Sequence, residues 1–293
     1  MGKADRQRQQ SARQRIAAQQ AAARKAEARR RLLLAGGAVV VVLAVVVTLI
    51  VIKLNSGTAK VPANSVTGTV LPASVSKDVT GVPGSTLDTV GAGSVLKIFT
   101  TPVTAISGAP LTQNGKPEML YIGAEFCPYC AAMRWSMAVA LSRFGTLSPL
   151  HGIHSSPTDA YPSTATLTFY KSSYSSRYLV FTPVENEKVN HSQLQATTAQ
   201  QQAIWNKYQP TNQGYPFIDI GNKYMLTYIY NPAVLQGKTW AQIAAALHDP
   251  SSPIAQGADG AANFITAAIC KITSDQPASV CSSAAVTAVT SHL

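Results

Sequence analysis

The uncharged segment 32–52, LLLAGGAVVVVLAVVVTLIVI, restricts the fold of this 293-residue chain more than any other feature. As a helix, its 21 residues would extend about 30 Å, which matches the hydrocarbon core of a bilayer. The run is longer than the apolar core of a typical secretory signal, and no small-x-small cleavage motif follows it. We therefore predict one uncleaved transmembrane helix, with a cleaved signal as the alternative.

The net charge of +11 is concentrated in the basic tail 1–31. Ten Lys and Arg residues there are opposed only by Asp5 and Glu27, so the tail carries +8 and the remaining 262 residues carry +3. The positive-inside rule places this tail in the cytoplasm and the chain from about Lys53 outside the membrane. The tail has no aromatic residues between its charges for stacking on bases, so we expect the cell membrane, and not nucleic acid, as its partner.

Residues 53–93 are rich in Ser, Thr, Gly, Pro and Val and show no sustained period. This composition predicts an extracytoplasmic linker, which would span about 35 Å if it were fully flexible. The recurring valines leave open that part of it packs as an additional edge strand. The folded domain is then expected over 94–293.

The apolar pattern of 94–293 predicts a mixed α/β domain. The stretch 118–124 is apolar almost throughout, as a buried central strand is. A hairpin is expected between 215–221 and 223–230, around Gly221 and Asn222. Further strands are expected at 94–100, 147–156, 164–170 and 177–184, and helices from Cys127 to about Phe144 and over 192–208, 239–248 and 258–271.

Cys127 and Cys130 are two of only four cysteines and directly follow the predicted central strand. At the start of a helix, Cys127 would lie against unpaired backbone N–H groups and the positive end of the helix dipole, which both favour the thiolate. Pro128 suits the first turn because no N–H is needed there. Cys130 would lie in the next turn, close enough to attack a mixed disulfide at Cys127. The pattern predicts a redox-active pair.

Two other interpretations of this pair are open. With His151 and His154, the cysteines give C-x2-C-x20-H-x2-H, but the histidine spacing is shorter than in typical zinc sites. We therefore expect no metal and interpret both histidines as ordinary surface or core residues. A structural Cys127–Cys130 disulfide is the second alternative, although such a bridge has no need of a helix dipole.

The stretches AEFCPYC, CPYCAAMRW, YSSRYLVFTPVE, YPFIDIGNKY and ITAAICKI…PASVC resemble the domain of unknown function 929 family of membrane-anchored thioredoxin-like proteins, over about residues 90–285. The Pro-Tyr dipeptide between the cysteines is also found in many glutaredoxins. The resemblance implies a thioredoxin-like fold with a cis-proline opposite the cysteines, for which Pro216 after Tyr215 is the candidate. The 85 residues between Cys130 and Pro216 exceed those of a minimal thioredoxin and imply an insertion over about 155–210.

This chain departs from the thioredoxin pattern before the cysteines. Many thioredoxins have a buried acid six residues before the first cysteine, where this chain has Tyr121. Glu125 is the nearest carboxylate and could replace that acid, but we favour an ion pair with Arg134 or exposure to solvent. Pro128, Tyr129, Glu125, Tyr215 and Pro216 are the expected supporting residues of the site.

These features predict a membrane-anchored, extracytoplasmic thiol–disulfide oxidoreductase in which Cys127 attacks and Cys130 resolves. Its partners would be protein thiols or disulfides outside the membrane, a membrane redox protein is a further candidate, and no cofactor is expected. The sequence does not determine the direction of electron flow, and the location outside the membrane favours an oxidase or isomerase. A non-enzymatic envelope-binding module on the same fold, with a structural disulfide, is the alternative.

Cys270 and Cys281 are the remaining cysteines. Outside the membrane they are expected to bond to each other, because residues 274–277 supply a turn between them. We predict a structural disulfide. A shuttle that passes electrons to Cys127 is the alternative, but neither cysteine has the placement at a helix start that activates a thiol.

Overall fold

A computed structural model describes residues 68–293. The predicted cytoplasmic tail (1–31), the predicted transmembrane helix (32–52) and the first part of the predicted linker lie outside the described residues. Within 68–293, no helix is both long enough and apolar enough to cross a membrane.

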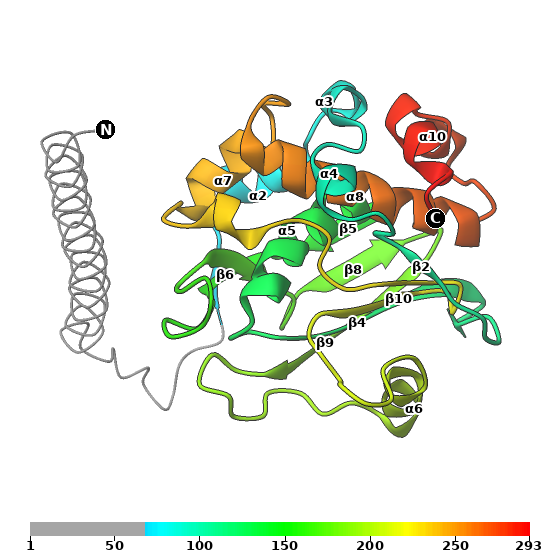
Figure 1. Ribbon diagram of the computed structural model, residues 1–293, viewed down its shortest axis with the longest axis horizontal. Coiled ribbons are helices and arrows are strands. Elements are labelled where there is room, and N and C mark those ends of the chain that lie inside the picture. The colour runs from blue at the N-terminus through cyan, green and yellow to red at the C-terminus, as the bar shows by residue number, and fades with distance from the viewer. Residues whose placement is uncertain (1–67) are drawn as a thin grey trace, which may run out of the picture. The chain divides into compact units, whose positions relative to one another are not determined.

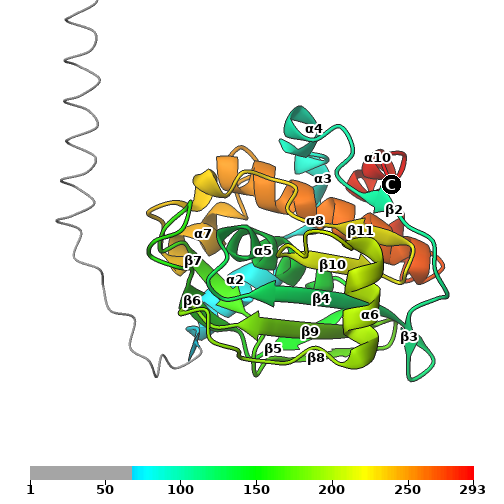
Figure 2. The same cartoon turned by 60° about the horizontal axis from the view of Figure 1, so that its bottom comes forward.

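Residues 68–293 form the predicted mixed α/β structure, built on a central sheet (Figure 1). Strand β4 (Lys116–Ala124) lies inside this sheet (Figure 2). It is buried over 118–124, as expected. Its neighbours are β9 (Val180–Glu187), which runs parallel to it, and β10 (Phe217–Ile220), which runs antiparallel. The sheet continues beyond β10 with β11 (Tyr224–Leu226) and β2 (Thr104–Ala105), and β3 (Thr112–Gln113) pairs with the start of β4.

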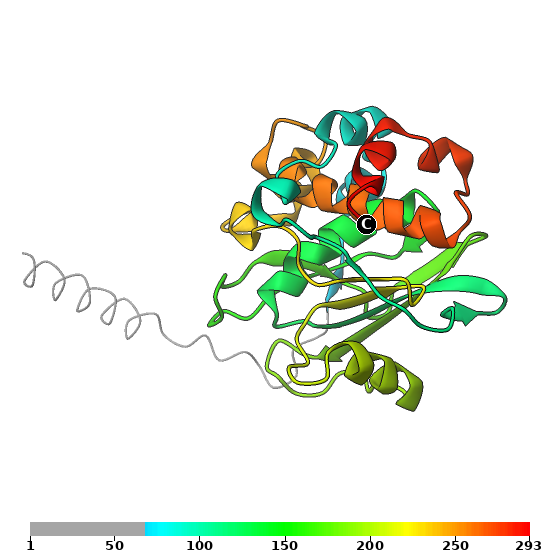
Figure 3. The same ribbon diagram turned by 45° about the vertical axis from the view of Figure 1, so that its right-hand side comes forward.

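The side chains of β4 separate two cores, because successive residues of a strand point to opposite faces of the sheet. Met119 and Tyr121 belong to the larger core, whereas Leu120 and Ile122 pack with Trp205 in a smaller one. Figure 3 shows the orange helix α8 on one side of the sheet and the yellow-green helix α6 on the other. The larger core is covered by α5 (Pro128–Ser142) and α8 (Pro253–Ile272), and the smaller one by α6 (Ala199–Tyr208).

Helix α8 is buried along most of its length and is surrounded by shorter helices. Its glycines allow close approach: a Cβ added at Gly260 would lie 2.8 Å from the Ala92 carbonyl oxygen. The elements in contact with it include α3 (Gly84–Val90), α4 (Val95–Ile98), η1 (Pro232–Leu235), α7 (Trp240–Ala246), α9 (Ala278–Cys281) and α10 (Ala284–Thr290).

Additional strands lie between α5 and β9 in the chain, where the sequence predicts strands. Strand β7 (Ala165–Thr168) packs on α5: Thr166 Oγ1 donates to the Ala131 carbonyl at 2.7 Å, and Trp135 Nε1 donates to the Ala165 carbonyl at 3.2 Å. They form two small sheets: β5 (Gly145–Ser148) pairs with β8 (Ser173–Ser176), and β6 (His151–His154) lies between β1 (Thr69–Val70) and β7 (Ala165–Thr168).

The predicted hairpin joins β10 and β11. Three residues, 221–223, separate the paired Ile220 and Tyr224, and Gly221 and Asn222 adopt the left-handed conformation there, with φ values of 70° and 55°. The predicted C-terminal helices are present as α7 and α8. Helix α8 begins earlier than expected, because the Ser252 hydroxyl accepts a hydrogen bond from Ala255 N at 2.9 Å and caps its first turn.

Residues 68–93 differ from the predicted linker. They form β1, the helix α2 (Ala73–Thr80) and α3, and they bury Val79 and Leu87 in the larger core. These helices are so short that their apolar residues show little periodicity, which explains why the pattern was missed. The folded unit therefore includes residues 68–93, and β1 pairs with β6 as an edge strand, the alternative considered for this region.

Two other elements differ from their predictions. Residues 94–100, expected as a strand, contain helix α4, because Ser94 N donates to the Gln256 carbonyl of α8 at 2.8 Å and so begins the turn against that helix. Only the second half of 192–208 is helical. Its first half is held by β9, since Gln195 N donates to the Glu185 carbonyl at 3.1 Å, and α6 begins at the capping box of Thr198 and Gln201.

Candidate functional site

The loop from β4 to α5 places Cys127 at the N-cap of the helix, as the sequence predicts. Its sulfur accepts a hydrogen bond from Cys130 N at 3.2 Å, and Pro128 is the first helical residue. The sulfur therefore takes the position that a Ser or Asp oxygen occupies in a typical N-cap. A negative charge at this position is stabilised by the N–H groups and by the helix dipole.

The two cysteines are free thiols with different environments. Cys127 is 4% exposed, and Cys130 is fully buried. A hydrogen bond with the Cys130 side chain is the largest cause that lowers the pKa of Cys127, and the Cys130 N–H and the charge of Arg134 act in the same direction against the effect of burial. Burial raises the pKa of Cys130 well above its ordinary value. Cys127 is therefore the thiol that ionises first.

The Tyr215-Pro216 peptide bond is cis and lies beside Cys127, as the resemblance to thioredoxin-like proteins implied. The Cys127 sulfur lies 3.7 Å from the Tyr215 carbonyl oxygen. The Tyr215 hydroxyl donates to Asn186 Oδ1 at 2.6 Å and lies 3.0 Å from Glu187 Oε1, at the end of β9. The loop before β10 is thus held at the same edge of the sheet as the cysteines.

The predicted environment of Glu125 was wrong. Arg134 pairs with Glu185 of β9, with Nε–Oε1 at 2.9 Å and Nη2–Oε2 at 2.6 Å, and Glu125 is 1% exposed. Its Oε1 has no hydrogen-bond partner among the described residues. Burial, followed by the negative charge of Glu185, raises the pKa of Glu125 to about 7. Glu125 is therefore a buried carboxyl group that changes protonation near neutral pH.

Tyr121 is fully buried, and its hydroxyl has no hydrogen-bond partner among the described residues. Burial raises the pKa of Tyr121 well above its ordinary value, so the hydroxyl stays neutral. The guanidinium of Arg134 lies 5.9 Å from the ring centroid. The ring also passes over Gly123, since any side chain there would collide with the Tyr121 hydroxyl. The position of the buried acid in many thioredoxins thus carries a neutral phenol.

Phe126 and Tyr129 pack beside the cysteines, and further aromatic rings pack on these two; the sequence analysis identified only Tyr129. Phe126 stacks on His191, with ring centroids 3.9 Å apart, and Tyr129 packs on Tyr228 at 4.3 Å and on Tyr161 at 5.9 Å. All five are at least partly exposed. We call this set the aromatic rim. Tyr161 and His191 come from loops far from the C-P-Y-C motif in the chain, so no local pattern could have found them.

The sequence analysis did not predict the Arg134–Glu185 pair, although the sequence around Arg134 indicates a buried, paired charge. It is the one charged residue in the stretch AAMRWSMAVAL of an otherwise apolar helix, and a charged residue in such a place is usually paired when buried. Its partner is 51 positions away in the chain and could not be chosen from the sequence.

The family model described as domain of unknown function (DUF929) matches residues 102–271. This chain belongs to that family. The matched range contains the C-P-Y-C motif, the cis peptide and Cys270, and it ends before Cys281. No curated protein and no solved structure matches the chain.

In this DUF929 member, His151 and His154 lie on β6. His151 is buried, and the ring of His154 lies 4.4 Å from that of Trp240. Within 68–293, no group of three or more His, Cys, Asp or Glu residues is arranged to hold a metal ion.

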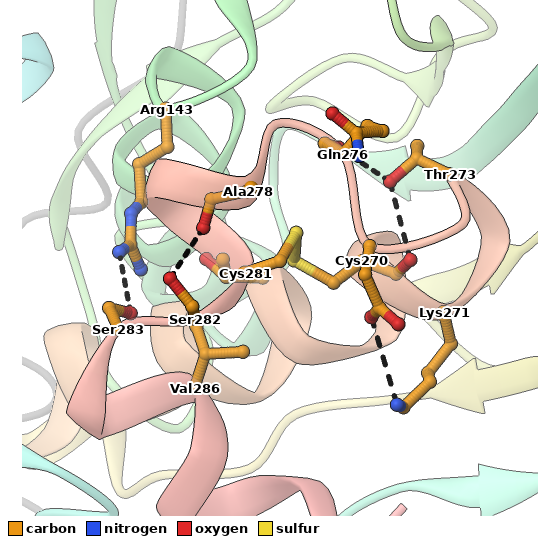
Figure 4. Close-up of a disulfide and its surroundings, with 12 residues drawn as sticks. Arg143, Cys270, Lys271, Thr273, Gln276, Ala278, Cys281, Ser282, Ser283 and Val286 are labelled. Atoms are coloured by element: carbon orange, nitrogen blue, oxygen red, sulfur yellow. Dashed lines mark hydrogen bonds and ion pairs between the residues drawn. A yellow bond between two sulfur atoms is a disulfide. The ribbon is translucent and has the colours of Figure 1, made fainter.

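Cys270 and Cys281 form the predicted disulfide, with their Cα atoms 5.6 Å apart. Figure 4 shows the bond joining the end of α8 to α9. Thr273 Oγ1 donates to the Gln276 carbonyl at 2.7 Å and closes the turn between the two cysteines. The bond therefore ties the C-terminal helices of this DUF929 protein to α8.

Proposed function

We propose that this protein is a membrane-anchored, extracytoplasmic thiol–disulfide oxidoreductase that acts on protein thiols or disulfides. The observation that carries the proposal is the position of the Cys127 sulfur, between the N–H of Cys130 and the carbonyl of Tyr215. A purely structural pair needs neither the helix N-terminus nor a lowered thiol pKa. Both properties are those of a nucleophilic cysteine.

The topology supports a thioredoxin-like assignment. β4, α5 and the parallel strand β9 form a βαβ unit with the C-x-x-C at its first turn. α6, the cis peptide, the antiparallel pair β10–β11 and α8 follow in chain order. On this assignment the added strands are β5 to β8, so the insertion begins before residue 155 and ends before β9, which belongs to the central sheet.

The proposed reaction is a two-step exchange. The Cys127 thiolate attacks one sulfur of a substrate disulfide, the substrate S–S bond breaks, and the leaving sulfur takes up a proton. Cys130 then loses its proton and attacks Cys127 in the mixed disulfide, which releases the second substrate thiol and leaves a Cys127–Cys130 disulfide. The substrate is reduced by two electrons and the cysteine pair is oxidised. The reverse sequence oxidises a substrate dithiol.

The environment of the cysteines favours the oxidase or isomerase direction. Interactions that stabilise the Cys127 thiolate also stabilise the reduced protein, and this makes its disulfide a stronger oxidant. The partly exposed aromatic rim favours polypeptide substrates, because it offers apolar contact area around the reactive sulfur. The Cys270–Cys281 disulfide supports a location in an oxidising compartment.

The test follows refolding of a reduced, unfolded disulfide protein in a series of thiol redox buffers. Wild-type protein should accelerate disulfide formation, Cys127→Ser should abolish the effect, and Cys130→Ala should accumulate mixed disulfides through Cys127. The double variant Cys270→Ala with Cys281→Ala is the matched control and should retain activity. A wild type that is inert in every buffer would favour the non-enzymatic binding module.

The proposed topology has a separate test. An impermeant thiol reagent applied to intact, reduced cells should label Cys127, because the basic tail and the segment 32–52 orient the domain outward. Labelling that requires permeabilised cells would overturn this orientation.

A further inference from the structure

We propose that Arg134 is a positioning residue that stabilises the thiolate of Cys127, and that Glu185 limits how much of the Arg134 charge reaches it. The inference rests on the proposed thiol–disulfide function and identifies the groups that tune its nucleophile.

The backbone links Arg134 to the reactive cysteine. Arg134 Nη2 donates to the Ala124 carbonyl oxygen at 2.8 Å, and the same oxygen accepts a hydrogen bond from Cys127 N at 3.2 Å. Arg134 also follows Cys130 by four positions in α5, so the two side chains share a face of the helix. The Ala124 carbonyl therefore connects the guanidinium to the backbone of the C-P-Y-C turn.

The Arg134–Glu185 pair is completely buried, with no exposed area on either side chain. Glu185 is held from a second direction, because Phe169 N donates to its Oε1 at 3.0 Å. Arg134 Nη1 has no hydrogen-bond partner among the described residues. Charges act more strongly in such a dry site than in water, and the Arg134 charge lowers the pKa of Cys127.

The other titratable groups around Cys127 do not supply a positive charge. They are Cys130 and Tyr129 of α5, Tyr121 of β4, Tyr215 before β10, and Glu125 in the loop before α5. Burial raises the pKa of Glu125 to about 7, so this carboxyl group is neutral at the acidic pH at which the variants are compared. The negative charge of Glu185 offsets that of Arg134. Loss of the Glu185 charge alone should therefore increase the thiolate fraction of Cys127, and loss of both charges should decrease it.

The experiment measures the rate at which iodoacetamide alkylates Cys127 in the reduced, full-length protein in detergent, as a function of pH. Mass spectrometry assigns the adduct to Cys127. Glu185→Gln should raise the rate at acidic pH, and the double variant Arg134→Met with Glu185→Met should lower it, each by about tenfold, as expected for a buried charge at short range. Arg134→Lys loses the bidentate contact with Glu185 but keeps the buried positive charge, so its rate should stay within about threefold of wild type.

Opposite directions for Glu185→Gln and the double variant support the inference, because a general loosening of the fold would change both rates in the same direction. Equal rates in all variants, or changes of one sign, would overturn it. If circular dichroism shows that Glu185→Gln does not fold, the double variant is compared with Arg134→Lys. A slow double variant beside a normal lysine variant supports the inference, and equal rates overturn it.

This measurement needs no substrate protein. If the protein does not exchange disulfides, but Glu185→Gln raises the alkylation rate and the double variant lowers it, the proposed function is refuted and the role of Arg134 stands. If the protein exchanges disulfides but the two rates do not change in these directions, the role of Arg134 is refuted and the proposed function stands.

Discussion

Asp259 offers a direct test of how burial affects the stability of this protein. It lies within α8, is fully buried, and neither carboxylate oxygen has a hydrogen-bond partner among the described residues. Burial raises the pKa of Asp259 to about 8. In the unfolded chain an aspartate has a pKa of about 3.9. The folded protein therefore binds one more proton than the unfolded chain between these two pH values.

The sign of the effect follows from proton linkage. Since the folded pKa is raised, the penalty for burying Asp259 is absent below about pH 4, grows as the pH rises, and is complete above about pH 8. At pH 7 it is about 4 kcal/mol, from about 1.4 kcal/mol for each pH unit above the unfolded pKa. Asp259→Asn keeps the shape and a polar group but cannot ionise. It should match wild type near pH 4 and be more stable at pH 7.

Thermal unfolding in detergent between pH 4 and pH 8, followed by circular dichroism, measures the difference. A gain of about 4 kcal/mol corresponds to an increase in Tm of about 8–16 °C for a domain of this size. The exposed Asp159 provides the control, because Asp159→Asn should follow the wild-type curve at every pH. Parallel curves for wild type and Asp259→Asn would refute the reasoning, since they would show that the buried carboxyl takes up no proton on folding.

Three further predictions concern the C-terminal disulfide and the surroundings of the cysteines. Cys270→Ala with Cys281→Ala should destabilise the fold by about 3 kcal/mol, measured as a lower Tm, while exchange at Cys127 persists; unchanged stability with lost turnover would favour the electron shuttle. Because burial raises the pKa of Glu125 to about 7, Glu125→Gln should increase the Tm at pH 8 and change it little at pH 4; an equal change at both values would contradict the buried carboxyl. Tyr129→Ala should slow exchange with an unfolded protein by about fivefold and leave exchange with a small disulfide unchanged; equal slowing of both would exclude a role of the aromatic rim in substrate contact.

Sequence patterns that span only a few residues predicted several elements of this fold, including those that hold the cysteines. The apolar run of β4, the helix start at Cys127, the Gly221 and Asn222 turn and the cysteine pair near the C-terminus each depend on residues close together in the chain. Backbone conformation and side-chain alternation act over this range. Such elements are therefore visible without a tertiary structure.

Elements that depend on distant contacts were missed or misassigned. α4 is a helix because its first residue docks on the Gln256 carbonyl of α8, and the residues of α2 and α3 are ordered by burial in the larger core. In isolation, such short helices are marginal. Tertiary packing supplies stabilisation that these segments lack in isolation, and their sequences show no clear helical period. The sequence therefore predicted a linker over α2 and α3 and a strand over α4.

The sequence by itself determined which sulfur caps the first turn of α5, because the strand, the C-P-Y-C motif and the helix start are contiguous. Only the tertiary structure decided what surrounds that sulfur. The choice of Glu185 over Glu125 as the partner of Arg134, and the rings of Tyr161 and His191 beside the cysteines, depend on how β7, β9 and their loops pack on α5. A buried charge is stabilised by a counter-charge that lies close to it in space, whatever the separation of the two residues along the chain.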